Sequence, residues 1–227
     1  PAFRAVICQN ADDFPADLLF RRKPRRKDVV RSFTFPGGLS DIPRAIAQQQ
    51  GLELRTGESV ASAHRRSDGG FRVLLDDGTE LGCDYLTLAV PPDVAAKLLQ
   101  SDRQDLSTLA ERINIAEVES LVLCIRGKDL EHLPPLAGLI AVDDAFYSAV
   151  SRDYLTDDTY RGFTFHFRPN ALSRDERVER ACKALGVGQE KVVASEWITN
   201  RLPALRAGHP DLVEKIDDLI AGSRLAL

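Results

Sequence analysis

ESVASAHRRSDGGFRVLLDDGTELGCDYLTLAVPP, residues 58–92, is the stretch that decides the fold. It holds two turn signals, Asp68-Gly69-Gly70 and Asp77-Gly78, and the second is a strong signal for a two-residue hairpin loop. Apolar and polar residues alternate around both signals. The pattern therefore predicts a meander of three strands, over 59–66, 71–75 and 80–84.

The same stretch ends in an apolar run without alternation, residues 85–90. Such a run is typical of a strand covered on both faces, as in a parallel sheet. Pro91-Pro92 terminates this strand, and a helix is expected from Val94 to Leu99.

Composition limits the class of protein. The 227 residues are 44% hydrophobic and 28% charged, which is ordinary for a globular protein of one large or two small domains. The net charge of -4 argues against nucleic acid as the main partner. No apolar run is long enough for a transmembrane segment, and no secretory signal opens the sequence.

The cysteines and histidines indicate neither a disulfide framework nor a metal site. The four cysteines are widely spaced without a Cys-x-x-Cys pair, which favours reduced thiols in a cytoplasmic protein. The four histidines are scattered, without the spacing of a metal-binding helix. We expect no metal.

The segment before residue 58 contains a basic run, residues 21–27, for which two interpretations stay open. It is a solvated connection, or a contact for an acidic partner or for substrate carboxylates. A strand is expected at 29–35 and a short one at 52–55. Between them a helix is predicted over 39–50, with Ser40 as N-cap and Gly51 at its end.

After about residue 113 the pattern changes to strands joined largely by turns. Alternation predicts strands at 118–125, 136–142, 146–151, 162–168 and 192–198. A helix over 173–185 carries a capping box formed by Ser173 and Glu176. The arrangement favours an antiparallel or mixed sheet in a second structural unit.

Two features have both a structural and a functional interpretation. Gly37-Gly38 precedes a helix, so it forms a simple turn or lets the backbone approach a ligand. Trp197, the single tryptophan, packs in a core or lines a site. No dinucleotide-binding or P-loop fingerprint occurs in the sequence, and no residue is assigned a catalytic role.

Several segments together resemble the superfamily of FAD-dependent amine oxidases and protoporphyrinogen oxidases. SFTFPGGLSDIPRAIAQQQG (32–51) is similar to a glycine-containing segment and helix of these enzymes, and 58–92 to the meander and strand that follow. Residues 146–153 and 161–167 resemble the substrate-domain sheet of the protoporphyrinogen-oxidase-like branch. Trp197, Pro203, Gly208 and His209 match a W…P…GH segment that precedes a second flavin-contacting motif.

The resemblance implies a fold class and a domain division. It implies a mixed α/β fold of the α+β class, with the meander and buried strand of an FAD-binding domain packed with a mostly antiparallel substrate-domain sheet flanked by helices. We expect an irregular or helical lead-in at 1–31, a partial FAD-binding unit at 32–113 and a substrate-domain unit at 114–200. Residues 201–227 would then return toward the FAD-binding unit.

The resemblance also implies cofactor-contacting residues. Val60 corresponds to the residue whose backbone meets the adenine, and Ala89 and Pro91 would lie beside the dinucleotide. Gly37 and Gly38 belong to the same set, and Trp197 would lie near the flavin or substrate. Leu205 stands where relatives often carry an aromatic residue, so the sequence departs from a substrate cage there.

The implied function is the substrate-side portion of an FAD-dependent oxidoreductase. Such an enzyme dehydrogenates a C–N or C–C bond of a small or macrocyclic substrate by hydride transfer to flavin. Because no phosphate-binding loop is present in the sequence, we expect the chain by itself to be inactive and to hold FAD weakly or not at all. The alternative is a non-catalytic α+β module that binds a ligand or another protein.

Overall fold

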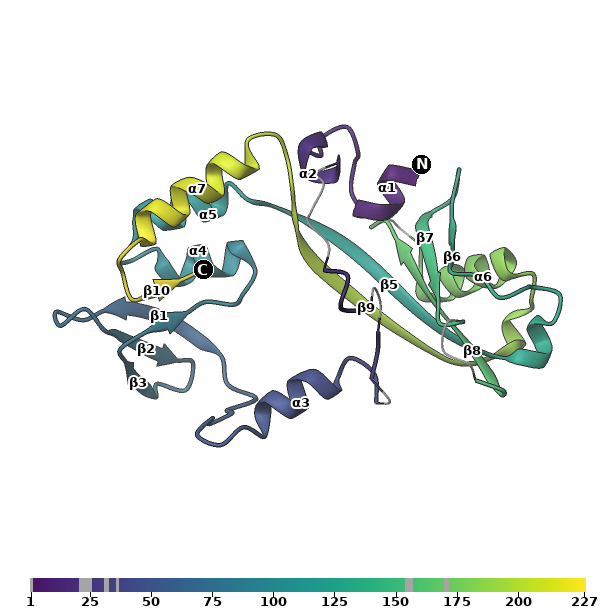
Figure 1. Cartoon of the computed structure of the whole chain (residues 1–227), viewed down its shortest axis with the longest axis horizontal. Coiled ribbons are helices and arrows are strands. Elements are labelled where there is room, and N and C mark those ends of the chain that lie inside the picture. Colours follow the sequence, from purple (N-terminus) through teal and green to yellow (C-terminus); the bar gives the residue numbers. More distant parts are fainter. Residues whose placement is uncertain (1, 21–25, 31–32, 36, 154–156, 170–171) are drawn as a thin grey trace.

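A computed structural model describes residues 2–20, 26–30, 33–35, 37–153, 157–169 and 172–227. Figure 1 shows two units joined by a long two-stranded ribbon, β5 and β9. Both strands have 13 residues and pair antiparallel along nearly their whole length: β5 is Asn114–Arg126 and β9 is Val192–Ala204.

The first unit contains the predicted meander. β1, β2 and β3 form an antiparallel sheet, and β4 pairs in parallel with β10 from the end of the chain. A helix that precedes the meander, α3, and three later helices belong to this half of the molecule (Figure 1). The bounds are α3 (Asp41–Ala47), β1 (Val60–Arg65), β2 (Phe71–Leu75), β3 (Glu80–Cys83), β4 (Leu86–Thr87), α4 (Pro92–Leu99), α5 (Gln104–Glu111), α7 (His209–Ile220) and β10 (Leu225–Ala226).

One hydrophobic core holds the first unit together, and it combines residues from the meander, α4 and α5 with residues near the C-terminal end of the sequence. Phe71 and Leu88 pack there with buried leucines of α4 and α5. Leu212 and Ile216 of α7 and Leu225 of β10 complete the cluster. The chain therefore returns to the first unit after it has built the second.

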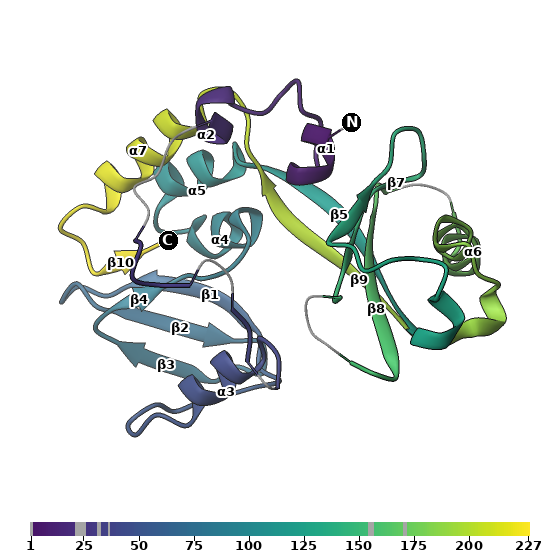
Figure 2. The ribbon, with the colours of Figure 1, turned by 45° about the vertical axis from the view of Figure 1, so that its right-hand side comes forward.

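The second unit is a five-stranded antiparallel sheet in the order β6-β7-β8-β5-β9. Helix α6 packs on one of its faces, and Figure 2 shows α1 on the opposite side. The remaining bounds are α1 (Ala2–Ile7), α2 (Ala16–Phe20), η1 (Gly127–Leu130), β6 (Gly138–Ile140), β7 (Phe146–Ser151), β8 (Tyr160–Phe167), α6 (Arg174–Leu185) and η2 (Gln189–Lys191).

Strand β8 shows how the sequence sorts residues between the two faces of this sheet. Its phenylalanines Phe163, Phe165 and Phe167 are all buried in the core beneath α6. Gly162, Thr164 and His166 alternate with them and lie on the opposite face, because side chains of a strand alternate with period two.

Helix α6 begins and ends where its sequence predicts. The Ser173 hydroxyl accepts from the Glu176 backbone N–H and the Glu176 carboxylate accepts from the Ser173 N–H, so the predicted capping box is confirmed. Gly186 ends the helix in the left-handed conformation with φ 72°, which glycine adopts without strain.

Most of the fold prediction is confirmed. The class is α+β, with the meander, a mostly antiparallel second sheet and flanking helices. The hairpin at Asp77-Gly78 is present, with Gly78 at φ 87°. The parallel pairing predicted for residues 85–90 is also present, but the strand is only Leu86–Thr87.

The predicted double coverage of residues 85–90 is wrong. Leu88 is buried, whereas Tyr85 is 74% exposed and Val90 40% exposed. A strand is buried on both faces only where other layers cover both, and here the described residues pack against one face. Of the two strands predicted upstream, 52–55 is not a strand, and neither 29–30 nor 33–35 is part of one. An extended segment forms a strand only when a neighbouring strand supplies backbone hydrogen bonds, and no described strand pairs with these segments.

Other predictions are corrected in detail. The helix expected over 39–50 extends only over Asp41–Ala47, and Ser40 makes no side-chain capping bond. Helix α5 was not predicted. Of the basic run 21–27, residues 21–25 lie outside the described residues, and Arg26 pairs with Asp28 in solvent. None of the helices in the described ranges has the length and apolar character that crossing a membrane requires.

Candidate functional site

The face of the five-stranded sheet opposite α6, called the open face below, carries a group of polar side chains. Strand register places them together: Ser120 of β5 lies opposite both His166 of β8 and Ile198 of β9, and His166 also lies opposite Ser148 of β7. Directly opposed residues of antiparallel strands point to the same face. The open face therefore gathers residues from four strands at one place.

Ser120 is the centre of a hydrogen-bonded group. Its hydroxyl oxygen accepts from the Asn200 side-chain amide at 2.9 Å and lies 3.2 Å from Nδ1 of His166. Ser120 is 6% exposed, so its hydroxyl needs such partners. We call Ser120, His166 and Asn200 the open-face triad.

Burial lowers the pKa of His166 below its usual value, because the charged imidazolium loses hydration. At neutral pH the ring is therefore uncharged, with one nitrogen donating and the other accepting. The single Ser120 hydroxyl proton can then donate to Nδ1 while its oxygen accepts from Asn200. We assign the proton of the ring to Nε2 from this network.

Apolar side chains border the triad on the same face. Ile198 lies directly opposite Ser120, Ile140 opposite Ser148, and Val150 opposite Thr164. Their exposed fractions are 48%, 52% and 42% in that order, although aliphatic side chains of this size are usually buried. The open face thus combines a satisfied polar centre with an aliphatic border.

Helix α1 lies beside this group. The Ser148 hydroxyl donates to the backbone carbonyl of Ala5 at 3.4 Å, and Ala5 is itself buried. Farther along, the Gln9 amide donates to the Leu205 carbonyl at 2.8 Å. The N-terminal segment is thereby tied to the open-face side of the sheet and to the end of β9 (Figure 2).

Three of the six predicted cofactor residues lie at β1, β4 and α4 of the first unit. Val60 begins β1 and is 42% exposed. Ala89 is exposed directly after β4, and Pro91 is the half-buried N-cap of α4. Ala89 and Pro91 follow the carboxyl end of β4, which pairs in parallel with β10, and ligands of open sheets bind at such strand ends. Val60 lies instead at the start of an antiparallel strand.

The other three residues lie away from these elements. Gly37 and Gly38 form the turn before α3, where the Gly37 N–H donates to the Asp41 carboxylate and Gly38 adopts φ 80°. Trp197 belongs to the second unit and faces α6, with the Arg177 guanidinium 4.4 Å from its ring centre. These contacts support the structural interpretation of Trp197 as a core residue.

The predicted cofactor residues fit part of an FAD molecule. Val60 and Ala89 are exposed and Pro91 is half-buried, so the three residues suit one side of a dinucleotide. The sequence contains no glycine fingerprint for the pyrophosphate. The residues present therefore fit an edge of the cofactor, and they would hold it through backbone contacts. In the described ranges no cluster of three or more His, Cys, Asp or Glu could hold a metal ion.

A second polar cluster has the connectivity of a hydrolase triad without its geometry. His64 Nε2 lies 2.9 Å from the Ser62 hydroxyl, and Nδ1 lies 3.4 Å from Asp102. Ser101 shares Nδ1 at the same 3.4 Å, and the Arg65 backbone N–H already donates to Asp102 at 2.5 Å. The cluster attaches β1 to the end of α4. The Ser62–His64 distance suits a serine and its base, but the 3.4 Å from His64 to Asp102 is longer than the hydrogen bond that orients the base in a triad.

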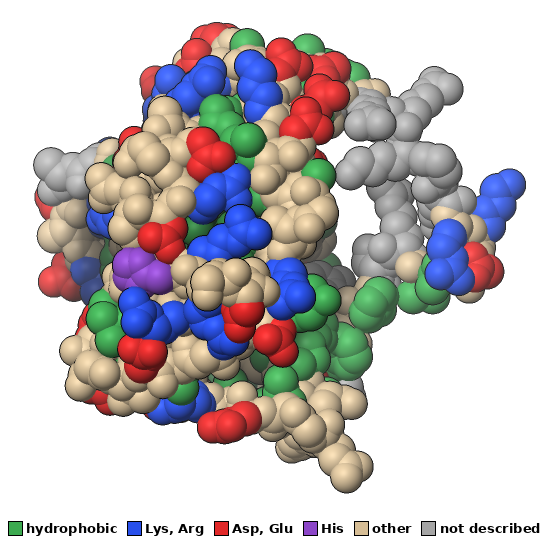
Figure 3. All heavy atoms as spheres, turned by 90° about the vertical axis from the view of Figure 1, so that its left-hand side faces the viewer, with side chains coloured by type: hydrophobic (Ala, Val, Ile, Leu, Met, Phe, Trp, Pro, Cys, Tyr) green, Lys and Arg blue, Asp and Glu red, His purple; other side chains and the backbone are tan. Residues whose placement is uncertain are grey.

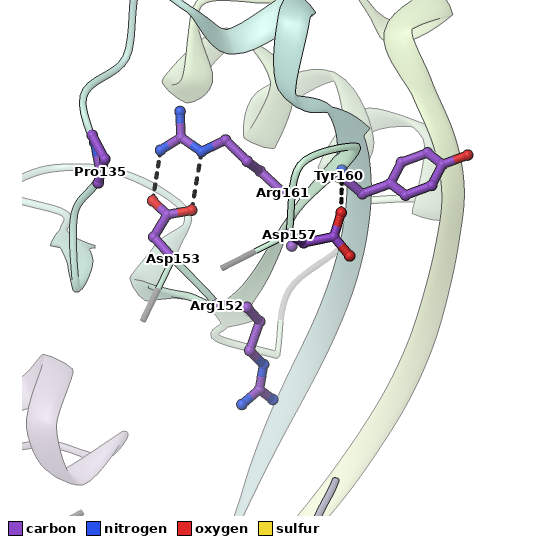
Figure 4. Close-up of a pocket in the computed structure, with 7 residues that line it drawn as sticks. Pro135, Arg152, Asp153, Asp157, Tyr160 and Arg161 are labelled. Atoms are coloured by element: carbon purple, nitrogen blue, oxygen red, sulfur yellow. Dashed lines mark hydrogen bonds and ion pairs between the residues drawn. The ribbon is translucent and has the colours of Figure 1, made fainter. Parts of the chain in front are cut away.

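Two further cavities lie in the second unit and beside it. One of about 450 Å³ contains the bidentate pair of Arg161 with Asp153, at 3.0 and 2.6 Å, and the Asp157 carboxylate that accepts from the Tyr160 N–H (Figure 4). Another, of about 460 Å³, lies between α1 and the β6–β7 region. Over the first unit, basic and acidic side chains are intermixed (Figure 3).

The fold is similar to that of several solved structures. A putrescine oxidase mutant from a redesign of cofactor binding matches with a TM-score of 0.59 and 16% identity, over 71% of this chain and 38% of that chain. The wild-type putrescine oxidase bound to putrescine matches with a TM-score of 0.54 and 15% identity, over the same 71% and 38%. A conjugated-linoleic-acid-producing fatty acid isomerase from P. acnes matches with a TM-score of 0.60 and 13% identity, over 83% of this chain and 46% of that chain.

The family model of the flavin-containing amine oxidoreductases matches residues 3–213. The chain belongs to this family, and the resemblance seen in the sequence is confirmed. It spans less than half the length of the solved structures that it matches. No curated protein sequence matches it.

Sequence reasoning missed the open-face triad, although a signal for part of it was present. In GFTFHF, residues 162–167, His166 takes a polar position between phenylalanines. Ser120 and Asn200 lie 46 and 80 residues away from their partners, so only the register of β5, β8 and β9 brings them together.

Proposed function

We propose that the chain is the substrate-side portion of an FAD-dependent oxidoreductase that dehydrogenates a C–N or C–C bond. The observation that carries the proposal is the family match over nearly the whole chain. When bound, the flavin would supply the hydride acceptor. The residues of this chain would orient the substrate and exclude water from it.

The open face supports this role because it is a wall built for a ligand. It belongs to the unit that resembles a substrate domain, and it places polar groups and exposed aliphatic side chains together. Among the described residues, α1 contacts this face at Ser148. Val60, Ala89 and Pro91 are proposed to contact FAD in the first unit. For Gly37, Gly38 and Trp197 the cofactor role rests on the resemblance alone.

We also propose the domain division 1–31, 32–113, 114–200 and 201–227. The boundary at residue 113 comes directly before β5, and the shared core of α7 and β10 with the meander unit supports a returning segment. The last boundary is better placed after Ala204, because β9 continues to that residue.

Flavin absorbance tests the proposed function. The 227-residue chain is expected to purify colourless, whereas the same chain expressed with the flanking sequence of its reading frame is expected to purify yellow. Substituting Ala89 by Asp in the longer chain should weaken flavin retention, because a carboxylate at the strand end repels the pyrophosphate. Substituting exposed Ala194 of β9 by Asp is the matched control.

Two results would contradict these expectations. A longer chain that folds and binds no flavin would favour the alternative, a module that binds a ligand or protein without a cofactor. A yellow 227-residue chain would show that a glycine-rich phosphate loop is dispensable for flavin binding.

A further inference from the structure

We propose that the open face recognises an uncharged substrate, with an apolar body and a carbonyl-type hydrogen-bond acceptor, in preference to a protonated amine. This inference rests on the proposed function and names the substrate class of the same site. It concerns the open-face triad and the aliphatic side chains that border it.

The direction of the hydrogen bonds gives the first argument. Asn200 donates to Ser120, and Ser120 can in turn donate to Nδ1 of His166. The ring proton is then on Nε2, for which the described residues offer no hydrogen-bond partner. The triad thus ends in a half-buried N–H donor, and a donor in such a place is stabilised by an acceptor on the ligand.

The distribution of charge gives the second argument. In the described part of the molecule, the partners of the triad are neutral side chains. Glu119 points to the opposite face, where it pairs with Arg177 at 2.5 Å. Glu196 lies on the open face, but opposite Val122 rather than Ser120, and it is exposed. An ammonium group presents only donors, so it would meet the Nε2–H donor without a carboxylate close enough to compensate.

The aliphatic border gives the third argument. Ile140, Val150 and Ile198 are each between 42% and 52% exposed and surround the polar centre on three strands. Covering them with an apolar ligand removes aliphatic surface from water, which favours binding. A ligand with an apolar body and one acceptor satisfies both parts of the surface.

Binding of two probes with matched chains tests the inference on the 227-residue protein. Hexanamide carries a carbonyl acceptor and hexylammonium carries only donors, and both have the same six-carbon chain. With histidine labelled by ¹⁵N at about pH 7.5, hexanamide is expected to shift the Nε2 resonance of His166 saturably. We expect its Kd to be about tenfold lower than that of hexylammonium, because only hexanamide can accept the N–H.

Variants assign the effect to the triad. His166→Leu removes the donor and should abolish the preference between the probes, while His166→Gln retains an N–H donor and should restore part of it. His209→Gln, in α7 of the first unit, should leave both affinities unchanged. Thermal unfolding of each variant shows whether the fold is retained.

Equal or tighter binding of hexylammonium would overturn the inference, and so would a His166 resonance that hexanamide does not shift up to its solubility limit. These readouts need no flavin. A failure here is therefore separate from a failure of the longer chain to bind flavin, which tests the proposed function.

Discussion

The two faces of the five-stranded sheet are built from the same strands and differ in what covers them. The face under α6 is a closed core of leucine, isoleucine and phenylalanine, and it includes the buried ion pair of Arg177 with Glu119. The open face carries a hydrogen-bonded triad and half-exposed aliphatic side chains. The difference indicates that one face stabilises the unit, whereas the other leaves polar and aliphatic side chains partly exposed.

Truncating a core phenylalanine should give the largest contrast between the faces. Phe165 is fully buried and lies 5.1 Å from the ring of Phe146, so Phe165→Ala should cost about 3–5 kcal/mol of unfolding free energy. Ile198→Ala on the open face should cost less than about 1 kcal/mol, because that side chain is half-exposed. Urea unfolding of both variants measures the contrast, and equal losses would mean that the open face is also a core.

Removing the buried cation under α6 should have the next largest effect. The Arg177 guanidinium pairs with Glu119 and lies over Trp197. Arg177→Ala leaves the Glu119 carboxylate without this partner and should cost about 3 kcal/mol. Arg180→Ala removes a solvent-exposed pair with Asp144 and should cost about 0.5 kcal/mol. The prediction is wrong if the two substitutions cost the same in chemical unfolding.

A smaller effect is expected from the cap of the helix that covers the closed face. Ser173→Ala removes the hydroxyl that accepts from the Glu176 N–H, so it should cost about 1 kcal/mol. Ser40→Ala is the matched control, because Ser40 makes no capping bond in α3. Differential scanning calorimetry should show a lower Tm for Ser173→Ala alone. A similar decrease in both variants would contradict the role of the capping box.

The pH dependence of His166 should be the smallest of these effects. Burial lowers the pKa of His166 in the folded state, so the unfolded chain binds a proton more readily. This contribution is fully present above the unfolded pKa of about 6.5 and is lost as pH falls toward the folded pKa. Unfolding at about pH 7.5 and about pH 5.5 should show a steeper loss in the wild type than in His166→Gln. Parallel pH profiles would show that the ring titrates normally.

Local patterns predicted those elements whose partners are close in the sequence. The hairpin at Asp77-Gly78 and the capping box of Ser173 and Glu176 depend on residues within a few positions of each other. The family resemblance also followed from segments of this kind, and the match over residues 3–213 confirms it.

The predictions that were wrong concern segments whose structure depends on partners far away in the sequence. Residues 52–55 alternate like a strand, but no described strand pairs with them. The apolar run at 85–90 forms only two strand residues, because its described partner, β10, is equally short. Leu39, Ile42 and Ile46 of the α3 segment are 64%, 44% and 55% exposed, so an amphipathic pattern by itself did not ensure a buried helix.

The sequence by itself determined the turns, the caps and the period-two sorting of β8, because these depend on backbone conformation and on neighbours a few residues away. It also determined the family. Tertiary structure alone decided that Phe163, Phe165 and Phe167 point toward α6, that Trp197 lies over Arg177, and that Ser120 meets His166 and Asn200. Those outcomes depend on strand register and on burial by distant segments, which no local pattern encodes.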